Sequence, residues 1–279
     1  MNPISNTAFY CCGIRMEDAK RTHSVCNDHY AERFMDARGR AIFEPFKAEK
    51  RANCSNIARC RIIDDHIKTE LKEDPELTVI TVGAGFDTRP YRLKGGKWIE
   101  IDEAQIIDYK NTCLPVAECP NPLTRISIDF SRDSLADTLE PFSHDRHTIF
   151  VIEGVLMYLE PIAITSTLQA IQQTFQQHVI YCDLMTRQFF EQFAQSVHDK
   201  LVAAGGSFTN RPDAPEEIFL QLGYHPLMHT TMFQRAAELG LFWDELRLPR
   251  PVAWLMLNWL KRDLGGYAVH KFAFKNECP

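Results

Sequence analysis

The amino-acid sequence predicts an α/β protein with a mainly parallel central sheet that is covered by helices on both faces. Short runs rich in β-branched residues alternate with segments long enough for helical crossovers, which is typical of βαβ units. The first run ends abruptly in a glycine-rich turn, as strands do at the ligand-binding edge of such sheets. The expected strands are 78–82, 98–101, 123–128, 148–152 and 178–182.

The bulk composition indicates a single domain with a sizeable core. The chain has 279 residues, of which 45% are hydrophobic and 24% charged. A net charge of -6 leaves no basic surplus for a nucleic acid partner. The longest apolar run, 252–260, is about half of the ~20 residues that a bilayer span requires. We therefore expect a cytoplasmic protein with no nucleic acid or membrane partner, and the sequence does not indicate its oligomeric state.

The alternation defines four parts of this one domain, 1–279. An N-terminal helical cap, 1–75, includes an amphipathic helix at 57–71, and the cofactor-binding α/β core is 76–185. An insertion or lid, 186–215, follows the fifth strand, and 216–279 completes the sheet. Expected elements beyond the core are helices at 186–204, 215–222 with Pro215 as first residue, near 233–239 and 252–262, and strands at 225–231 and 267–274.

The glycine turn indicates a nucleotide-like ligand without a pyrophosphate. Gly83 and Gly85 leave the first strand where a side chain would obstruct a tight turn or a closely approaching ligand. The dinucleotide fingerprint requires a third glycine at position 88, which is Thr88 here. An NAD-dependent oxidoreductase is therefore the less favoured alternative.

Acidic residues end the next three strands of the predicted core. Asp102 lies nineteen residues beyond Gly83, where an acid can accept hydrogen bonds from ribose hydroxyls. Asp129 precedes Phe130, an aromatic edge suited to adenine, and Glu153 ends the fourth strand. These acids predict an acidic lining that favours a cationic nucleoside such as a sulfonium.

No metal site is predicted. His225 and His229 are four residues apart, but Pro226 between them interrupts a helical ligand pair. The nine cysteines contain no C-x-x-C pair, so we expect reduced thiols that pack as small apolar side chains.

Several segments, in order from Asn56 to Pro161, resemble the leucine carboxyl methyltransferase-like family of class I S-adenosylmethionine-dependent O-methyltransferases. They are "NIARCRIIDDHI", "VGAGFDTRPYRL", "IEIDEAQIIDYK", "SIDF" and "IEGVLMYLEP". The resemblance implies a Rossmann-like sheet of seven strands with an antiparallel last strand. It also implies S-adenosyl-L-methionine as the cofactor.

The resemblance assigns roles to individual residues of the cofactor site. Arg59 matches the arginine that pairs with the methionine carboxylate, although neighbouring Arg61 is an alternative, and Arg15 is a second candidate contact. Arg89 is expected to brace the turn through Asp87. The remaining expected contacts are Gly83 and Gly85 with the methionine portion, Asp102 with the ribose, Asp129 and Phe130 with the adenine, and Glu153 with the amino group.

The methyl acceptor is expected to be a small molecule, with a polyketide-like natural product favoured. A carboxylate acceptor would be ionised already, whereas a hydroxyl would require a general base. No catalytic residue is assigned, and the candidates are Tyr158, His225 and His198. Arg187 and Arg211 are further candidate acceptor contacts.

The aromatic residues of the insertion and of the N-terminal helices form either core or acceptor pocket. They are Phe189, Phe190, Phe193, Phe208, Phe9 and Tyr10. The resemblance leaves a protein C-terminal carboxyl methyltransferase as an alternative, because the family includes such enzymes. A non-catalytic S-adenosylmethionine-binding protein is another alternative, because methyl transfer requires no obligatory catalytic side chain.

Overall fold

A seven-stranded sheet forms the centre of the protein, as seen in a computed structural model that describes residues 6–143, 146–242, 249, 251–252 and 263–275. The strand order is β3-β2-β1-β4-β5-β7-β6. The strands are β1 (Thr78–Val82), β2 (Lys97–Asp102), β3 (Leu123–Ser127), β4 (Thr148–Ile152), β5 (Gln177–Met185), β6 (His225–Thr231) and β7 (Tyr267–Lys275).

The first five strands pair in parallel, whereas β7 runs antiparallel to both of its neighbours, β5 and β6. This arrangement confirms the predicted mainly parallel sheet with an antiparallel last strand. β1 and β4 are buried at every residue, as expected for central strands that are covered on both faces. The predicted positions of β1, β4 and β6 agree with the structure at both ends.

Helices cover both faces of the sheet. The principal helices are α1 (Thr7–Ala19), α2 (Ala37–Phe43), α3 (Lys50–Glu73), α5 (Ala104–Cys113), α7 (Pro161–Thr174), α9 (Gln195–Ala203) and α11 (Met232–Glu238). Shorter helices are α4 (Arg89–Arg92), α6 (Leu135–Leu139), α8 (Arg187–Phe189) and α10 (Glu217–Gln221). One buried cluster joins α1, α3 and α11 to one face of the sheet, and a second joins α7 and α10 to the other.

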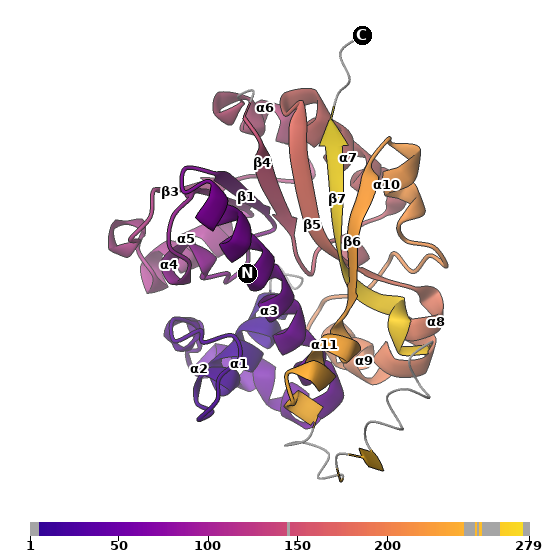
Figure 1. Ribbon diagram of the computed structural model, residues 1–279. Helices are drawn as coiled ribbons and strands as arrows, with labels where there is room; N and C mark the ends of the chain where they lie inside the picture. The colour runs from indigo at the N-terminus through magenta and orange to yellow at the C-terminus, as the bar shows by residue number, and fades with distance from the viewer. Residues whose placement is uncertain (1–5, 144–145, 243–248, 250, 253–262, 276–279) are drawn as a thin grey trace.

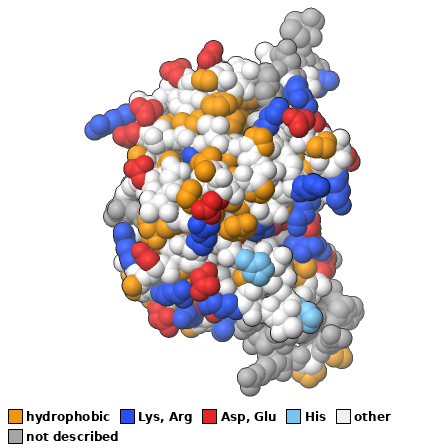
Figure 2. Space-filling view, turned by 90° about the vertical axis from the view of Figure 1, so that its left-hand side faces the viewer, with side chains coloured by type: hydrophobic (Ala, Val, Ile, Leu, Met, Phe, Trp, Pro, Cys, Tyr) orange, Lys and Arg blue, Asp and Glu red, His pale blue; other side chains and the backbone are white. Residues whose placement is uncertain are grey.

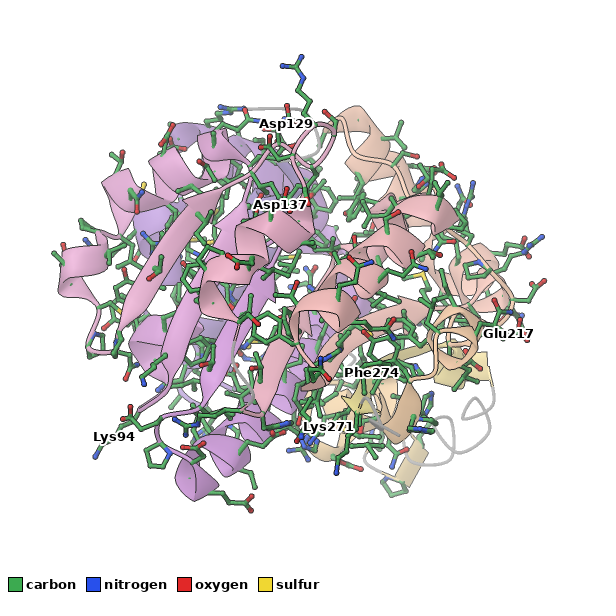
Figure 3. All side chains as sticks on the ribbon, turned by 90° about the horizontal axis from the view of Figure 1, so that it is seen from above. Lys94, Asp129, Asp137, Glu217, Lys271 and Phe274 are labelled. Carbon is green, nitrogen blue, oxygen red and sulfur yellow. The ribbon has the colours of Figure 1, made fainter. Side chains whose placement is uncertain are left out.

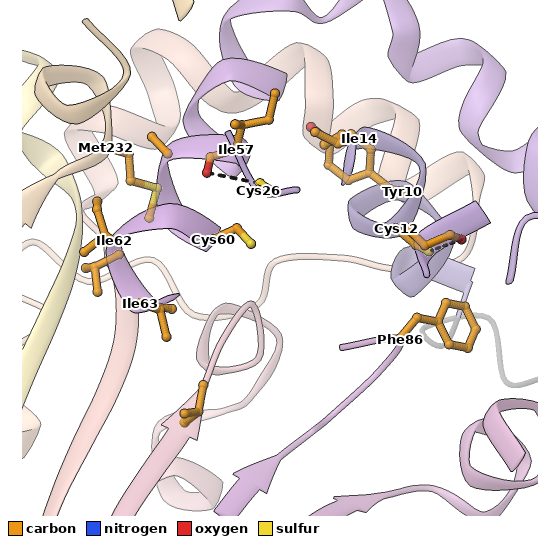
Figure 4. Packing of buried hydrophobic residues seen from close by; sticks show 14 of the residues in the cluster. Tyr10, Cys12, Ile14, Cys26, Ile57, Cys60, Ile62, Ile63, Phe86 and Met232 are labelled. Atoms are coloured by element: carbon orange, nitrogen blue, oxygen red, sulfur yellow. Dashed lines mark hydrogen bonds between the residues drawn. The ribbon is translucent and has the colours of Figure 1, made fainter. Parts of the chain in front are cut away.

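The α3 helix connects the N-terminal helices to the sheet. The stripe predicted from its sequence is buried at Ile57, Ile63, Ile67 and Leu71. Figure 4 shows this packing, with Ile57 and Cys60 on α3 beside Cys26, whose thiol donates to the Ile57 carbonyl at 3.6 Å. The burial of Cys26 and Cys60 agrees with the expected use of cysteine as a small apolar side chain.

The lid and its neighbours lie beyond the carboxyl ends of the parallel strands. Figure 1 shows α1 and α2 together with α8 and α9 at the same end of the sheet. The predicted helix 186–204 is present but contains a π-helical segment, Phe190–Ala194, between α8 and α9. The prediction was wrong for Pro215, because α10 begins at Glu217 and Pro215 precedes it. The predicted helix 252–262 lies largely outside the described residues.

Both signs of charge occur on the surface. Figure 2 shows acidic and basic side chains interspersed around hydrophobic ones on the face that it displays. No helix within the described part of the chain combines the length and apolarity needed to cross a bilayer.

Candidate functional site

A cavity of about 680 Å³ lies at the carboxyl ends of β1, β2, β4 and β5, beneath α1 and the lid. Its volume falls within the roughly 300–1,000 Å³ that is usual for small-molecule sites. Its wall contains eight of the predicted cofactor contacts and catalytic candidates: Arg15, Arg59, Gly83, Gly85, Asp102, Phe130, Glu153 and Tyr158. These predicted residues therefore lie together around one cavity.

The glycine turn after β1 forms one wall of the cavity. Gly83 and Gly85 have φ values of 72° and 46°, a region that residues with a Cβ rarely adopt. A Cβ on Gly83 would lie 2.5 Å from Cγ2 of Val155. The Gly83 amide donates to the Ile101 carbonyl at 2.9 Å, which fixes the turn against the end of β2.

Asp102 lies at the end of β2 and faces the same turn. Its Oδ2 accepts from the Gly85 amide at 2.6 Å and its Oδ1 from the Glu103 amide at 2.7 Å. Burial raises the pKa of Asp102 to about 6, although these two amides act in the opposite direction. Each oxygen retains acceptor capacity, so the carboxylate can hold the turn and still bind ligand hydroxyls.

Thr81 contributes an unsatisfied hydroxyl to the floor of the cavity. Its side chain is 3% exposed, and its Oγ1 has no hydrogen-bond partner within the described structure. Because buried hydroxyls normally have a partner, this atom marks a position that a polar ligand group can satisfy. No sequence pattern distinguished Thr81 from the other residues of its strand.

Asp129 and Phe130 are adjacent but occupy different environments. Phe130 lines the cavity and is 45% exposed, which leaves its ring available for a flat ligand. Asp129 is not part of the cavity wall; its Oδ1 accepts from the Ser131 amide and hydroxyl at 3.0 and 2.6 Å. Figure 3 shows Asp129 at the periphery of the molecule, where it orders the turn that presents Phe130.

Arg59 lies at the centre of a buried ionic cluster. Its Nε donates to Glu153 at 2.8 Å, and its Nη1 donates to Asp183 and to the Tyr267 hydroxyl, each at 3.0 Å. Among the described residues, its Nη2 donates a hydrogen bond to the thiol of Cys11 alone, at 3.5 Å. The guanidinium is therefore held rigidly and retains one nitrogen that can donate to a ligand. The alternative, Arg61, is not on the cavity wall and pairs with Asp65 at 2.7 Å.

A second arginine, Arg89, supports the glycine turn from below. It contacts Asp64, Asp87 and Glu153 at 2.7, 2.9 and 2.8 Å. The Asp87 contact agrees with the predicted bracing role. Burial acts to raise the pKa of Glu153, but the adjacent guanidinium groups of Arg89 and Arg59 outweigh it and hold the pKa below its usual range. Glu153 is therefore a fixed anion.

Arg15 of α1 approaches the turn from the opposite side. Its Nε donates to Asp28 at 2.8 Å, and its Nη2 donates to the Phe86 carbonyl at 2.6 Å. These contacts fix α1 to the loop that follows Gly85. Arg15 thus reaches the cavity as predicted, with its main hydrogen bonds already directed to the protein.

The predicted acidic lining is wrong in its net charge. The described wall carries five acidic residues, Glu49, Asp87, Asp102, Glu103 and Glu153, and five basic residues, Arg15, Lys50, Arg51, Arg59 and Arg89. The sequence indicates acids such as Asp102 and Glu153 because they end predicted strands. The basic residues lie on α1, α3 and α4, and the sequence does not show that these helices pack against the strand ends. Because the acids are matched, net charge alone does not select a cationic ligand.

The other end of the cavity is apolar and lies beneath the lid. Its wall includes Met185, Phe189, Phe193, Val197, Leu201, Phe208 and Phe233. Of the aromatic residues whose role the sequence left open, Phe189, Phe193, Phe208 and Tyr10 line the cavity, whereas Phe9 and Phe190 are buried away from it. The aromatic side chains of the lid thus contribute both to the hydrophobic core and to the cavity wall.

Tyr158 lies beside this apolar end. Its ring contacts Phe208 edge-on, with ring centroids 5.1 Å apart. Burial raises the pKa of Tyr158 well above its ordinary value, so the phenol is neutral near pH 7. It can donate a hydrogen bond to a ligand, but it is a poor proton acceptor.

The histidine candidates lie off the described cavity wall. His198 contacts Ser207 at 3.3 Å and packs against the Phe208 ring, within the lid itself. His225 is exposed on β6 at the edge of the sheet. Their proposed participation as cavity bases is therefore not supported by their positions. Nor do Arg187 and Arg211 line the cavity: Arg187 pairs with Asp213 at 3.2 Å, and Arg211 covers the Phe190 ring.

Sequence reasoning missed Asp183, which completes the Arg59 cluster. Its side chain is fully buried on β5, and its Oδ1 accepts from the Gly154 amide at 2.6 Å. The available signal was an acid within the apolar run "VIYCDLM", because a buried carboxylate requires a partner. Among described residues, no group of three or more His, Cys, Asp or Glu side chains is arranged to hold a metal ion.

Comparison with known proteins connects this geometry to a family. A family model described as leucine carboxyl methyltransferase matches residues 11–172, more than half of the chain. A candidate S-adenosyl-L-methionine-dependent methyltransferase of Mycolicibacterium gilvum is 32% identical over 179 residues, which cover 57% of this chain and 59% of that protein. A similarly named protein of Frankia alni is 27% identical over 168 residues, covering 56% and 60%. The chain thus matches about three fifths of the length of these curated relatives.

Solved structures share the fold over nearly the whole chain. A candidate methyltransferase of Thermobifida fusca has a TM-score of 0.57 at 14% identity and covers 94% of this chain and 97% of its own. A DUF574 family protein of Streptomyces avermitilis has a TM-score of 0.58 at 12% identity, with coverage of 92% and 99%. The sheet therefore has the predicted Rossmann-like class I methyltransferase fold. On the match of the family model, the chain belongs to the leucine carboxyl methyltransferase family.

Proposed function

We propose that the protein is an S-adenosyl-L-methionine-dependent methyltransferase that methylates an oxygen atom, carboxylate or hydroxyl, of a small-molecule metabolite. The observation that carries this proposal is one continuous cavity with two unlike ends. One end has the glycine turn, Asp102 and Phe130, and the other is apolar and lies beneath the lid. Family membership and the names of the relatives support the same activity.

The residues of the first end fit S-adenosylmethionine. Gly83 and Gly85 leave room beside the turn, and Asp102 has acceptor capacity for ribose hydroxyls. The Nη2 of Arg59, which donates to the Cys11 thiol at 3.5 Å, has a second hydrogen that can donate to a carboxylate, and the Thr81 hydroxyl, without a partner among described residues, can bond a polar group or a bridging water. When bound, the cofactor supplies a methyl group made electrophilic by its sulfonium.

The remaining work of the protein is to orient the acceptor and to exclude water. The lid covers the apolar end, and Glu49 ties the lid to α3 because it accepts from Ser196 at 2.7 Å and from Lys200 of α9. An acceptor seated there would be held between the lid and the cofactor end. A natural product with an apolar body is the acceptor that this lining favours.

Calorimetry followed by methyl transfer tests the proposal. We expect S-adenosylmethionine and S-adenosylhomocysteine to bind with one-to-one stoichiometry, and NADH not to bind. Tritiated methyl from S-adenosylmethionine should then appear on members of a panel of aromatic and aliphatic acids, phenols and alcohols. Binding of NADH without S-adenosylmethionine would contradict the proposed class, and cofactor binding without transfer to any acceptor would favour a non-catalytic binding protein.

A further inference from the structure

A second cavity lies on the opposite face of the sheet from the first. Its volume is about 400 Å³, and its wall includes Leu184 of β5 together with Ala268 and His270 of β7. Met185 and Tyr267, which neighbour these residues in the chain, line the first cavity instead. Because successive side chains of a strand point to opposite faces, the sheet separates the two cavities. The second cavity is therefore distinct from the proposed cofactor site.

Two histidines face each other on the wall of this second cavity. His229 of β6 and His270 of β7 are Cα partners in the antiparallel register. Their ring centroids are 4.8 Å apart, and their ring planes are inclined at 80°. His270 is 8% exposed, yet neither imidazole forms a hydrogen bond with a described residue. Because buried polar side chains normally have a partner, the ring nitrogens are available to a ligand in the cavity.

The spacing of the two rings suits a shared metal ion. Two imidazole nitrogens that bind one tetrahedral zinc ion at about 2.0–2.1 Å are about 3.3 Å apart. Rings with centroids 4.8 Å apart can each direct one nitrogen to a common point at that separation. Burial lowers the pKa of His270 to about 4, and His229 acts in the same direction. The His270 imidazole is therefore neutral near pH 7 and keeps the lone pair that a metal requires.

The charge on the wall also favours a cation. Glu216, directly before α10, is the only charged side chain on the described part of this wall, and it forms no ion pair with a described residue. Imidazole ligands favour ions such as Zn²⁺, Ni²⁺ and Cu²⁺, whereas Mg²⁺ and Ca²⁺ prefer oxygen ligands. Since the described residues form no group of three or more such ligands, water would complete the coordination of an ion held by two imidazoles.

We propose that His229 and His270 bind one divalent transition-metal ion in the second cavity, with the Glu216 carboxylate as a nearby negative charge. The ion would cross-link the edge strand β6 to β7. The sequence favours no such site because its search compared His229 with His225 on the same strand, whereas the structure pairs His229 with a histidine of the neighbouring strand. Binding at this site does not require the cofactor, since the sheet lies between the two cavities.

Equilibrium dialysis against Zn²⁺ tests the site in the full chain without an affinity tag. We expect one Zn²⁺ ion to bind per chain. His229→Gln and His270→Gln should each weaken binding by at least about tenfold, because loss of even an indirect partner of a metal ligand costs that much. His225→Gln is the matched control, since it removes an exposed histidine of the same strand that is not on the described wall. This variant should bind Zn²⁺ as the wild type does.

Electron paramagnetic resonance with one equivalent of Cu²⁺ identifies the ligands. The wild-type spectrum should show coupling to two imidazole nitrogens, and the His229→Gln spectrum to one. His229 is exposed, so its replacement should preserve the fold, as checked by circular dichroism, even where His270→Gln does not. No binding of Zn²⁺ to the wild type, equal affinity in the wild type and His229→Gln, or equally strong binding of Mg²⁺ would each overturn the proposal.

Discussion

The Asp102 carboxylate accepts hydrogen bonds from two backbone amides, that of Gly85 in the glycine turn and that of Glu103, the next residue. We expect Asp102→Ala to weaken S-adenosylmethionine binding by about 1.5–3 kcal/mol, because a charged acceptor of hydroxyl hydrogen bonds is lost. Isothermal titration calorimetry measures the change. Asp137→Ala, at an exposed position of α6, is the control and should bind normally. A dissociation constant that Asp102→Ala leaves unchanged would remove Asp102 from the binding site.

The same residue predicts how cofactor affinity depends on pH. The pKa of Asp102 is raised to about 6 by burial, so the carboxylate becomes protonated as the pH falls through 6. A protonated carboxyl is a weaker acceptor for ribose hydroxyls. Cofactor affinity should therefore fall between pH 7 and pH 5. The Asp102→Asn variant, which cannot titrate at this position, should lose this part of the pH dependence.

Arg59 should be important for stability as well as binding. Arg59→Met removes the cation that pairs with the buried Asp183 and leaves Glu153 with Arg89 alone, and an uncompensated buried carboxylate typically costs about 3–5 kcal/mol. Urea unfolding followed by circular dichroism measures the loss of unfolding free energy. Arg61→Met, which breaks a half-exposed pair with Asp65, should lose less than about 1 kcal/mol. Similar losses in the two variants would show that the cluster contributes little.

For individual residues, the sequence predicts which side chains lie near the cavity better than it predicts their hydrogen-bond and ion-pair partners. Gly83, Asp102 and Glu153 stand at strand ends and are recognisable there. The partners of Arg59 are 94, 124 and 208 positions away in the chain, so no local pattern could pair them. The histidines were proposed for their chemistry, but His225 lies on the edge strand β6, a position set by strand order rather than by local sequence.

At the scale of elements, Glu49 connects two helices that both line the cavity. Its carboxylate accepts from Ser196 and Lys200 of α9, while its own residue precedes the first turn of α3. Glu49→Gln should loosen the lid, and hydrogen exchange of residues 195–203 should accelerate because local opening requires less free energy. Asp199→Asn, an exposed acid on the same helix, should leave this exchange rate near that of the wild type. Equal exchange rates in all three proteins would exclude Glu49 as a fastening of the lid.

The strands were predictable because their hydrophobic patterns are local. β1 and β4 are short apolar runs bounded by turns, which distinguishes them from helices. The π-helical segment of the lid was not predictable, since it depends on packing rather than on composition. Proline favours the first helical position, so the sequence predicts a helix that begins at Pro215, yet Pro215 is buried two residues before α10 begins.

At the scale of the whole molecule, buried titratable groups predict a loss of stability in acid. His178 and His270 have pKa values lowered to about 4 by burial. Because the unfolded chain binds protons at these histidines from about pH 6.5, their contribution to stability is lost as the pH falls from 6.5 to 4. The pKa of Glu70 is lowered to about 2: burial opposes the shift, but hydrogen bonds from His147, Lys271 and Tyr181 outweigh it. That contribution is lost between about pH 4.5 and pH 2.

Asp102 acts in the opposite direction, because its raised pKa makes the folded protein the stronger proton binder between about pH 4 and pH 6. The two histidines together outweigh this single carboxyl. The melting temperature should therefore fall by roughly 10 °C between pH 7 and pH 4, as measured by calorimetry. His270→Gln should reduce the fall, and a melting temperature that is constant over this range would contradict the prediction.

The hydroxyl of Tyr267 joins the ionic cluster of Arg59 from the last strand, where it donates to Asp183 at 2.8 Å and accepts from Arg59 at 3.0 Å. The helix that carries Arg59 is synthesised early, whereas Tyr267 is added 208 positions later. During translation, the strands of the cofactor end are therefore synthesised long before Tyr267 is available to complete the hydrogen bonds around Arg59. The capacity to bind the cofactor should be gained late in synthesis, once β7 has left the ribosome and paired with β5.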